Sequence, residues 1–147
     1  MIAESRLQNQ DAVLLIHLSD RRFGLPLALV ERVLPMAAVV SLPETSEGLI
    51  GVLNLRGDIV PVIDPRPRLG LPTPAMNAEQ HLVLLSGTTR FLLWVDAIEE
   101  VVPASDALAT VPAQQASPLV PRVIRLGDAL VPILAPAVLE PRSGVAR

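Results

Sequence analysis

The chain has 147 residues and a net charge of −3; half of its residues are hydrophobic, and it contains no cysteine. The length suits one domain, and a chain of this size can bury a substantial core. Disulfides and thiolate chemistry are excluded, which fits a cytoplasmic protein. With one Arg-Arg pair as its only basic cluster and just two phenylalanines and one tryptophan, the chain is not expected to bind nucleic acid.

No stretch of the sequence predicts insertion into a membrane. The apolar runs are shorter than the ~18 residues that a membrane-spanning helix needs. The first residues, "MIAESRLQNQDAV", lack the basic and apolar regions of a secretory signal. We therefore expect a cytoplasmic location. The polar ends, about residues 1–10 and 141–147, are expected to be disordered.

In chain order, the predicted elements occur twice. The apolar run "AVLLIHL" is followed by "RFGLPLALVERVL", a proline-rich loop, and a Gly-Asp turn within "NLRGDIVPVIDPRPRLG". The same order returns with "HLVLLS", "RFLLWVDAIEEVV", a long irregular loop over 103–122 and "GDALVPILAPAVL". At an offset of 68 residues, Val33 meets Val101 and Glu31 meets Glu99. Such self-similarity predicts two copies of one structural unit.

The repeated runs predict strands. Each is short, rich in Val, Leu and Ile, and bounded by Gly, Pro, Asp or Ser. Fifteen prolines argue against long helices, and Pro61 and Pro132, inside the last strand of each unit, should lie at an edge or a bulge. The prediction is a single all-β domain over 1–147. It consists of two pseudo-symmetric barrels of about five strands, over 12–72 and 80–140. We expect them to share a hydrophobic core, with strands crossing between them, because neither half buries much alone.

Few residues offer catalytic or metal-binding chemistry. A nucleophile needs a neighbouring base, but the chain has no lysine, and its two histidines, His17 and His81, belong to apolar runs. Asp58 and Asp64 are spaced for one face of a strand, yet Pro61 interrupts the register, and both aspartates stand at turn-forming positions. We therefore predict no catalytic residue, no metal ion and no cofactor.

Arg56 stands apart from this pattern. It precedes the Gly-Asp of the turn and should project into solvent at a hairpin tip. The second unit has Leu126 at the matching place, so the fold does not require the arginine. Because arginine is enriched at the energetic centres of protein interfaces, Arg56 is a candidate binding residue. Arg66 and Arg68 flank a proline and are expected at a solvated edge.

These stretches resemble the CheW family, the adaptors of bacterial chemosensory arrays. "GLIGVLNLRGDIVPVIDPRPRLG" is similar to the family signature, and "FGLPLALVERVLP", "LLWVDAIEEVVP" and "IRLGDALVPILAPAVL" resemble other strands, so that about residues 12–140 are covered. The resemblance implies two five-stranded SH3-like barrels around a shared core. It also implies a non-catalytic adaptor that couples methyl-accepting chemoreceptors to the regulatory domain of a CheA-type histidine kinase at membrane-associated arrays. The pathway is flagellar chemotaxis or a pilus-motility or other alternative.

The resemblance also implies which residues of the signature bind partners. Arg56 matches the arginine of the family's Asn-Leu-Arg-Gly motif, which is implicated in receptor and kinase coupling. Gly51 and Asn54 match signature positions that shape the hairpin.

A second group of candidates is apolar. Val30 and Val33 match positions beside a groove between the barrels, where the receptor tip docks as a helical hairpin, and Ile98 is the candidate from the second unit. Two alternatives stay open at this point. A small-molecule-binding regulatory barrel predicts an enclosed pocket with convergent polar groups. An esterase or protease built on Asp58 and Asp64 ranks last.

Overall fold

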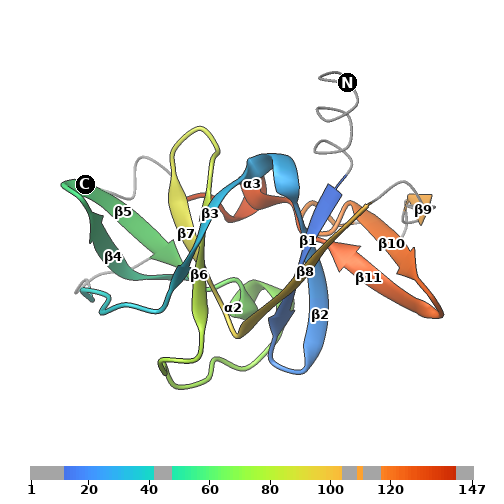
Figure 1. Cartoon of the computed structure of the whole chain (residues 1–147), viewed down its shortest axis with the longest axis horizontal. Helices are drawn as coiled ribbons and strands as arrows, with labels where there is room; N and C mark the ends of the chain where they lie inside the picture. Colours follow the sequence, from blue (N-terminus) through green and yellow to red (C-terminus); the bar gives the residue numbers. More distant parts are fainter. Residues whose placement is uncertain (1–11, 42–47, 104–108, 111–116, 142–147) are drawn as a thin grey trace.

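The computed structural model describes residues 12–41, 48–103, 109–110 and 117–141 (Figure 1). The ends expected to be disordered and much of the 103–122 loop lie outside the described residues. The strands are β1 (Ala12–Leu18), β2 (Arg21–Pro26), β3 (Val30–Pro35), β4 (Leu49–Leu55), β5 (Asp58–Ile63), β6 (His81–Leu85), β7 (Phe91–Val95), β8 (Ala97–Pro103), β9 (Ala109–Thr110), β10 (Arg122–Leu126) and β11 (Ala129–Ile133). A 3-10 turn, Leu27–Leu29, precedes β3, and the one-turn helices α2 (Arg66–Leu69) and α3 (Pro136–Leu139) follow β5 and β11. The predicted all-β class is confirmed.

The strands form two sheets with the same internal order. One sheet runs β8-β1-β2-β11-β10-β9 and the other β3-β6-β7-β5-β4. In each, a parallel pairing joins the two hairpins, β11 with β2 and β5 with β7. Five strands of the first sheet match those of the second one for one, and the two-residue β9 is an addition. The predicted pair of pseudo-symmetric five-stranded units is confirmed.

The sheets do not follow the two halves of the repeat. β1 and β2 join strands β8 to β11 of the second half, whereas β3, β4 and β5 join β6 and β7. The predicted division into barrels over 12–72 and 80–140 therefore does not match the sheets. The physical reason is that the 3-10 turn Leu27–Leu29 carries the chain from one sheet to the other after β2, and the short β7–β8 link carries it back.

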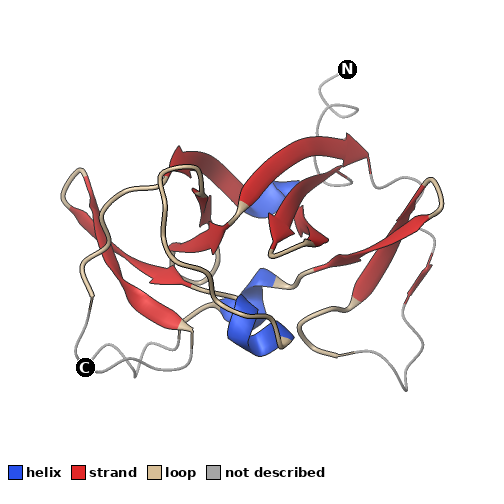
Figure 2. Cartoon of the chain, turned by 90° about the horizontal axis from the view of Figure 1, so that it is seen from below, coloured by secondary structure: helices blue, strands red, loops and turns tan. Residues whose placement is uncertain are grey.

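Apolar side chains alternate between two cores along the inner strands. In β6, Val83 belongs to a core that both sheets share, while Leu84 fills the interior of one barrel. β1 does the same, with Leu14 in the shared core and Leu15 inside the other barrel. Strands buried on both faces need unbroken apolar runs, which explains "HLVLL" and "AVLLIHL". The predicted shared core is confirmed, and Figure 2 shows the helical turns gathered between the sheets, where Leu139 packs against that core.

The prolines within β5 and β11 cost no ladder hydrogen bond. Val52 exchanges both of its backbone hydrogen bonds with Val40, at 2.9 Å each, so its pairing with Pro61 carries none. The Pro61 nitrogen therefore faces away from β4, on the side where pairing with β7 begins only at Val62. Pro132 has the same place in β11. Both strands are interior, so the prediction of an edge or a bulge is wrong. Each proline lies instead just before the parallel pairing begins.

Candidate protein-binding site

The β4–β5 hairpin displays Arg56 at its tip. Leu55 pairs with Asp58, so Arg56 and Gly57 are the two turn residues, with φ of 53° and 95°. Positive φ at both positions is the pattern of a type I′ turn, which favours Asn-Gly. Arg56 is exposed, and among the described residues none forms an ion pair with its guanidinium. The structure thus places Arg56 at the expected hairpin tip, and its role in binding stays a prediction.

The second hairpin corrects the residue matched to Arg56. Leu126 pairs with Ala129, so the turn residues are Gly127 and Asp128, and of these two only Gly127 has a positive φ, 61°. Gly127, not Leu126, therefore holds the turn position of Arg56. The alignment of the two Gly-Asp pairs missed this because glycine is second in one turn and first in the other. An L-residue in this conformation costs ~1–2 kcal/mol, so Arg56 is present against the preference of the backbone.

Asn54 and Gly51 support the hairpin that carries Arg56. The Asn54 side-chain oxygen accepts the Gly57 N–H at 2.7 Å, which braces the turn. Gly51 is buried further along β4, where a Cβ would collide with the Val40 carbonyl oxygen. At this point the segment after β3 crosses β4 to form the bridge between Val40 and Val52. Within the described residues, the contacts of Asn54 and Gly51 thus shape the hairpin.

Val30, Val33 and Ile98 lie away from the hairpin, on the edge strands β3 and β8. Among the described strands, β3 pairs with β6 alone and β8 with β1 alone. Paired residues on adjacent strands share a face of the sheet. Val33 pairs with Val83 and Ile98 with Ile16, both of the shared core, and Val30 packs against that core. The three predicted residues therefore face the middle of the molecule, which β3 and β8 flank in Figure 1.

Val101 completes this set, although it is not among the predicted site residues. It pairs with Leu14 of the shared core and is 51 % exposed, against 37 % for Val33. The offset of 68 residues that relates Val33 to Val101 is the signal that identifies it. We call Val30, Val33, Ile98 and Val101 the central apolar face.

Each edge strand also carries a glutamate at a β-bulge, and this glutamate forms an ion pair with an arginine. The register shifts beside Glu31 in β3 and beside Glu99 in β8. Arg90 Nε lies 3.3 Å from Glu31, and Arg22 donates two hydrogen bonds of 3.0 and 2.9 Å to Glu99. The Arg22 hydrogen bond, and with it the contact from His17 at 2.9 Å, lowers the pKa of Glu99 below its ordinary value of 4.5. Both glutamates thus form contacts between elements of the fold, as their presence in both repeats suggests.

Arg66 is fully buried, so the prediction of a solvated edge is wrong for it. Its guanidinium lies 2.9 Å from Asp64, 3.0 Å from Asp96 and 4.5 Å from the centre of the Trp94 ring. Asp64 also accepts the backbone N–H of Arg66 at 3.0 Å, which is the predicted turn role. The burial escapes local sequence reasoning because Asp96 and Trp94 come from β7 and its end, about thirty residues away. Arg68 is exposed, as predicted.

Asp58 and Asp64 do not form a carboxylate pair. Asp58 is exposed at the hairpin, 3.3 Å from Arg90 Nη1, whereas Asp64 is buried beside Arg66.

The small-molecule alternative requires an enclosed pocket with convergent polar groups. A depression of about 420 Å³ between β2 and β11 is open to solvent and lined mainly by charged and apolar side chains, including Arg21. In the part of the chain that the structure describes, no helix is long and apolar enough to cross a membrane.

Two five-stranded β-barrels that exchange strands around a shared core define the class of the chain, a double-barrel β-domain. The chain belongs to the CheW-like domain family, which matches residues 12–140. The resemblance found in the sequence is confirmed.

Related proteins are named CheW. The probable chemotaxis protein CheW of Rhizobium etli is 25 % identical over 103 residues, 69 % of this chain and 66 % of that protein. The chemotaxis protein CheW of Rhizobium meliloti is 25 % identical over 88 residues, 59 % of this chain and 57 % of that protein. The match thus spans less than two-thirds of either relative. The crystal structure of the scaffolding protein TtCheW from Thermoanaerobacter tengcongensis has the same fold, with a TM-score of 0.80, 24 % identity, and coverage of 92 % of this chain and 95 % of that one.

Proposed function

We propose that the chain is a non-catalytic adaptor that couples methyl-accepting chemoreceptors to a CheA-type histidine kinase, in flagellar chemotaxis or a related pathway. Its membership of the CheW-like family over residues 12–140 supports the class. The observation that supports a specific site is the conformation of Arg56. This exposed arginine has a φ of 53°, which glycine adopts more easily. Strain of this kind at an exposed position is typical of residues retained for binding.

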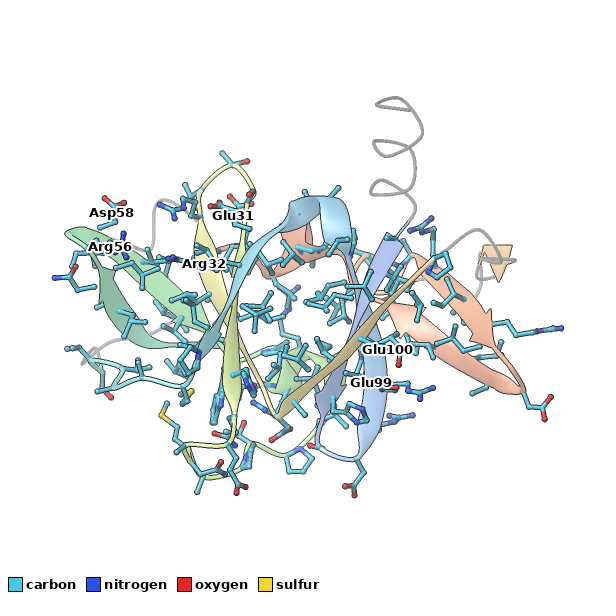
Figure 3. The ribbon with its side chains drawn as sticks, in the orientation of Figure 1. Glu31, Arg32, Arg56, Asp58, Glu99 and Glu100 are labelled. Carbon is cyan, nitrogen blue, oxygen red and sulfur yellow. The ribbon has the colours of Figure 1, made fainter. Side chains whose placement is uncertain are left out.

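In this proposal, two separate surfaces bind the two partners. The hairpin tip with Arg56 lies at one end of the long axis (Figures 1 and 3), while the central apolar face belongs to β3 and β8, which flank the middle of the molecule in Figure 1. An apolar strip along two edge strands suits the apolar side of a helical hairpin, so the central apolar face takes the receptor tip. The hairpin tip takes the regulatory domain of the kinase, with Arg56 as an anchor. Since receptor tips are cytoplasmic, the adaptor works in the cytoplasm at membrane-associated arrays.

The test separates these two surfaces. Binding is measured by calorimetry to two purified probes from the same genome, the regulatory domain of a CheA-type kinase and the helical tip of a chemoreceptor. We expect Arg56→Asp to weaken kinase binding about 30-fold, which corresponds to ~2 kcal/mol, and to leave receptor binding unchanged. A Val33→Asp, Val101→Asp double variant should lose receptor binding and keep kinase binding, because it places two charges on the apolar face.

A matched control is Arg122→Asp, which removes an exposed arginine from β10 and should leave both affinities unchanged. Thermal melts establish that each variant is folded. The proposal fails if the wild-type chain binds neither probe. If Arg56→Asp unfolds the protein, Arg56 is a structural residue, and the assignment of the hairpin tip fails on its own.

A further inference from the structure

The β6–β7 loop, residues 86–90, is held by a carboxylate that comes from the other barrel. Glu140 follows α3, and α3 follows β11 of the opposite sheet. Its carboxylate accepts the backbone N–H groups of Thr88 and Thr89, at 3.0 and 2.7 Å, and the Thr89 hydroxyl at 3.2 Å. Hydrogen bonds to a charged acceptor are stronger than those between neutral groups. Because the preceding Leu139 is buried in the shared core, the loop is fastened to a firmly placed element outside its own sheet.

Gly87 lets the Glu140 carboxylate approach the loop this closely. A methyl group at Gly87 would collide with the carboxylate. Gly87 is not among the glycines with a positive φ, so the glycine provides space and not an unusual backbone conformation. Alanine at this position therefore suits the backbone but displaces the carboxylate without removing it.

The loop ends at Arg90, which connects it to β3 and to the β4–β5 hairpin. The Arg90 guanidinium lies 3.3 Å from Glu31 of β3 and 3.3 Å from Asp58 of the hairpin. Asp58 is the second residue after Arg56, and Figure 3 shows Glu31, Arg56 and Asp58 at the same end of the molecule. A continuous series of contacts thus runs from Glu140 through the loop and Arg90 to the hairpin tip.

Among the described residues of the other barrel, no such series reaches the β10–β11 turn. Gly70 follows α2 where Glu140 follows α3, so this position has no carboxylate. Ala129 stands at the place of Asp58 in the equivalent hairpin and offers no ion pair. The fold therefore does not require these contacts, and they occur in the barrel whose hairpin carries Arg56.

We infer, on the basis of the proposed function, that Glu140 is a positioning residue for the kinase-binding hairpin tip. It acts through Arg90 and holds Arg56 in its binding geometry without touching the kinase itself. The ion pairs of Arg90 are exposed, and such pairs contribute little to stability. Their effect is on binding, because a hairpin tip that is already fixed loses less conformational entropy when the partner docks.

Two variants break the contact of Glu140 with the loop in opposite ways. Glu140→Ala removes the carboxylate, and Gly87→Ala displaces it. We expect each to weaken calorimetric binding of the kinase regulatory domain about fivefold and to leave binding of the receptor tip unchanged. Because both variants remove the same contact, the double variant should bind no more weakly than either alone. Glu79→Ala, at an exposed glutamate without an ion pair in the described ranges, is the matched control and should change neither affinity.

Arg90→Ala tests whether the effect passes through Arg90. On this background Glu140→Ala should not weaken kinase binding further, because the intermediate contact is already absent. A direct contact of Glu140 with the kinase would instead make the two changes additive. A general loss of stability would also be additive, and it would weaken receptor binding as well.

NMR provides a measurement that needs no kinase. The Arg90 Nε–H and the Gly57 backbone N–H should exchange with water about threefold faster in Glu140→Ala than in the wild type, because the loop and the hairpin tip open more often. Thermal melts verify folding, and Glu140→Gln replaces Glu140→Ala if the latter does not fold.

The inference is overturned if these exchange rates are unchanged, if Glu140→Ala and Gly87→Ala both bind the kinase domain as the wild type does, or if Glu140→Ala and Arg90→Ala are additive. If the wild type binds neither probe, the proposed function fails, and the exchange rates alone decide whether Glu140 positions the hairpin tip.

Discussion

At the scale of single residues, the position of Arg56 at the hairpin tip exposes its side chain at a cost in stability. Its φ of 53° lies in the left-handed region, and the equivalent turn position of the other barrel holds Gly127. We expect Arg56→Gly to raise the free energy of unfolding by ~1 kcal/mol, because glycine adopts this conformation without the steric cost. Urea denaturation measures the change. The opposite result, a less stable variant, would mean that the Arg56 side chain supports the fold.

Glu99 provides a residue-scale prediction about pH. Its pKa is lowered in the folded state by the Arg22 hydrogen bond and the contact with His17, so the unfolded chain takes up its proton at a higher pH than the folded chain does. The stabilising contribution of Glu99 is therefore complete above its ordinary pKa of 4.5 and is lost as the pH falls through the lowered value.

The check is to compare urea denaturation of the wild type and of Glu99→Gln at about pH 7 and about pH 3. We expect the variant to be less stable at the higher pH, and the difference to shrink at the lower pH because protonated glutamate resembles glutamine. Glu100→Gln is the control, since Glu100 has no ion-pair partner in the described ranges. A difference that stays constant with pH would show that Glu99 acts through packing alone.

At the scale of elements, the sequence predicts what depends on local pattern and misses what depends on distant partners. The unbroken apolar runs of β1, β6 and β7 identify strands buried on both faces, and the repeat identifies their equivalence, including that of Val33 and Val101. The crossing of strands between the two units is expected from the sequence, but which strands cross follows from the direction that the turn Leu27–Leu29 gives the chain, which no periodicity encodes. The burial of Arg66 likewise depends on carboxylates that come from two different elements.

The predicted binding residues divide in the same way. Arg56 is predictable because a turn motif places it at a tip, and the central apolar face is predictable because the repeat relates β3 to β8. The distance between the two surfaces is not predictable, since it depends on how β3 and the β4–β5 hairpin are placed at opposite edges of one sheet. The type of each turn also escapes the sequence alignment, because the two Gly-Asp pairs occupy different turn positions.

At the scale of the whole molecule, the buried Arg66 cluster joins the two barrels. Arg66 belongs to α2, which follows β5 of one sheet, and Asp96 lies in the link between β7 and β8, where the chain changes sheets. Asp96 also accepts the backbone N–H of Ser19, at 2.6 Å, from the β1–β2 turn of the other sheet. The cluster therefore connects elements of both sheets around a single arginine.

Arg66→Met tests this connection. Removing one partner from a buried ion cluster leaves charges without compensation, so we expect the free energy of unfolding to fall by about 3–5 kcal/mol in urea denaturation. Adding Asp64→Asn should recover part of the loss, since it removes one of the two uncompensated charges. Arg68→Met, an exposed change in the same helical turn, should alter stability by no more than ~0.5 kcal/mol. Because the central apolar face spans both barrels, the folded Arg66→Met protein should also bind a receptor tip more weakly. Unchanged binding together with reduced stability would limit the cluster to holding the fold, and a stability loss no greater than that of Arg68→Met would refute its role in joining the barrels.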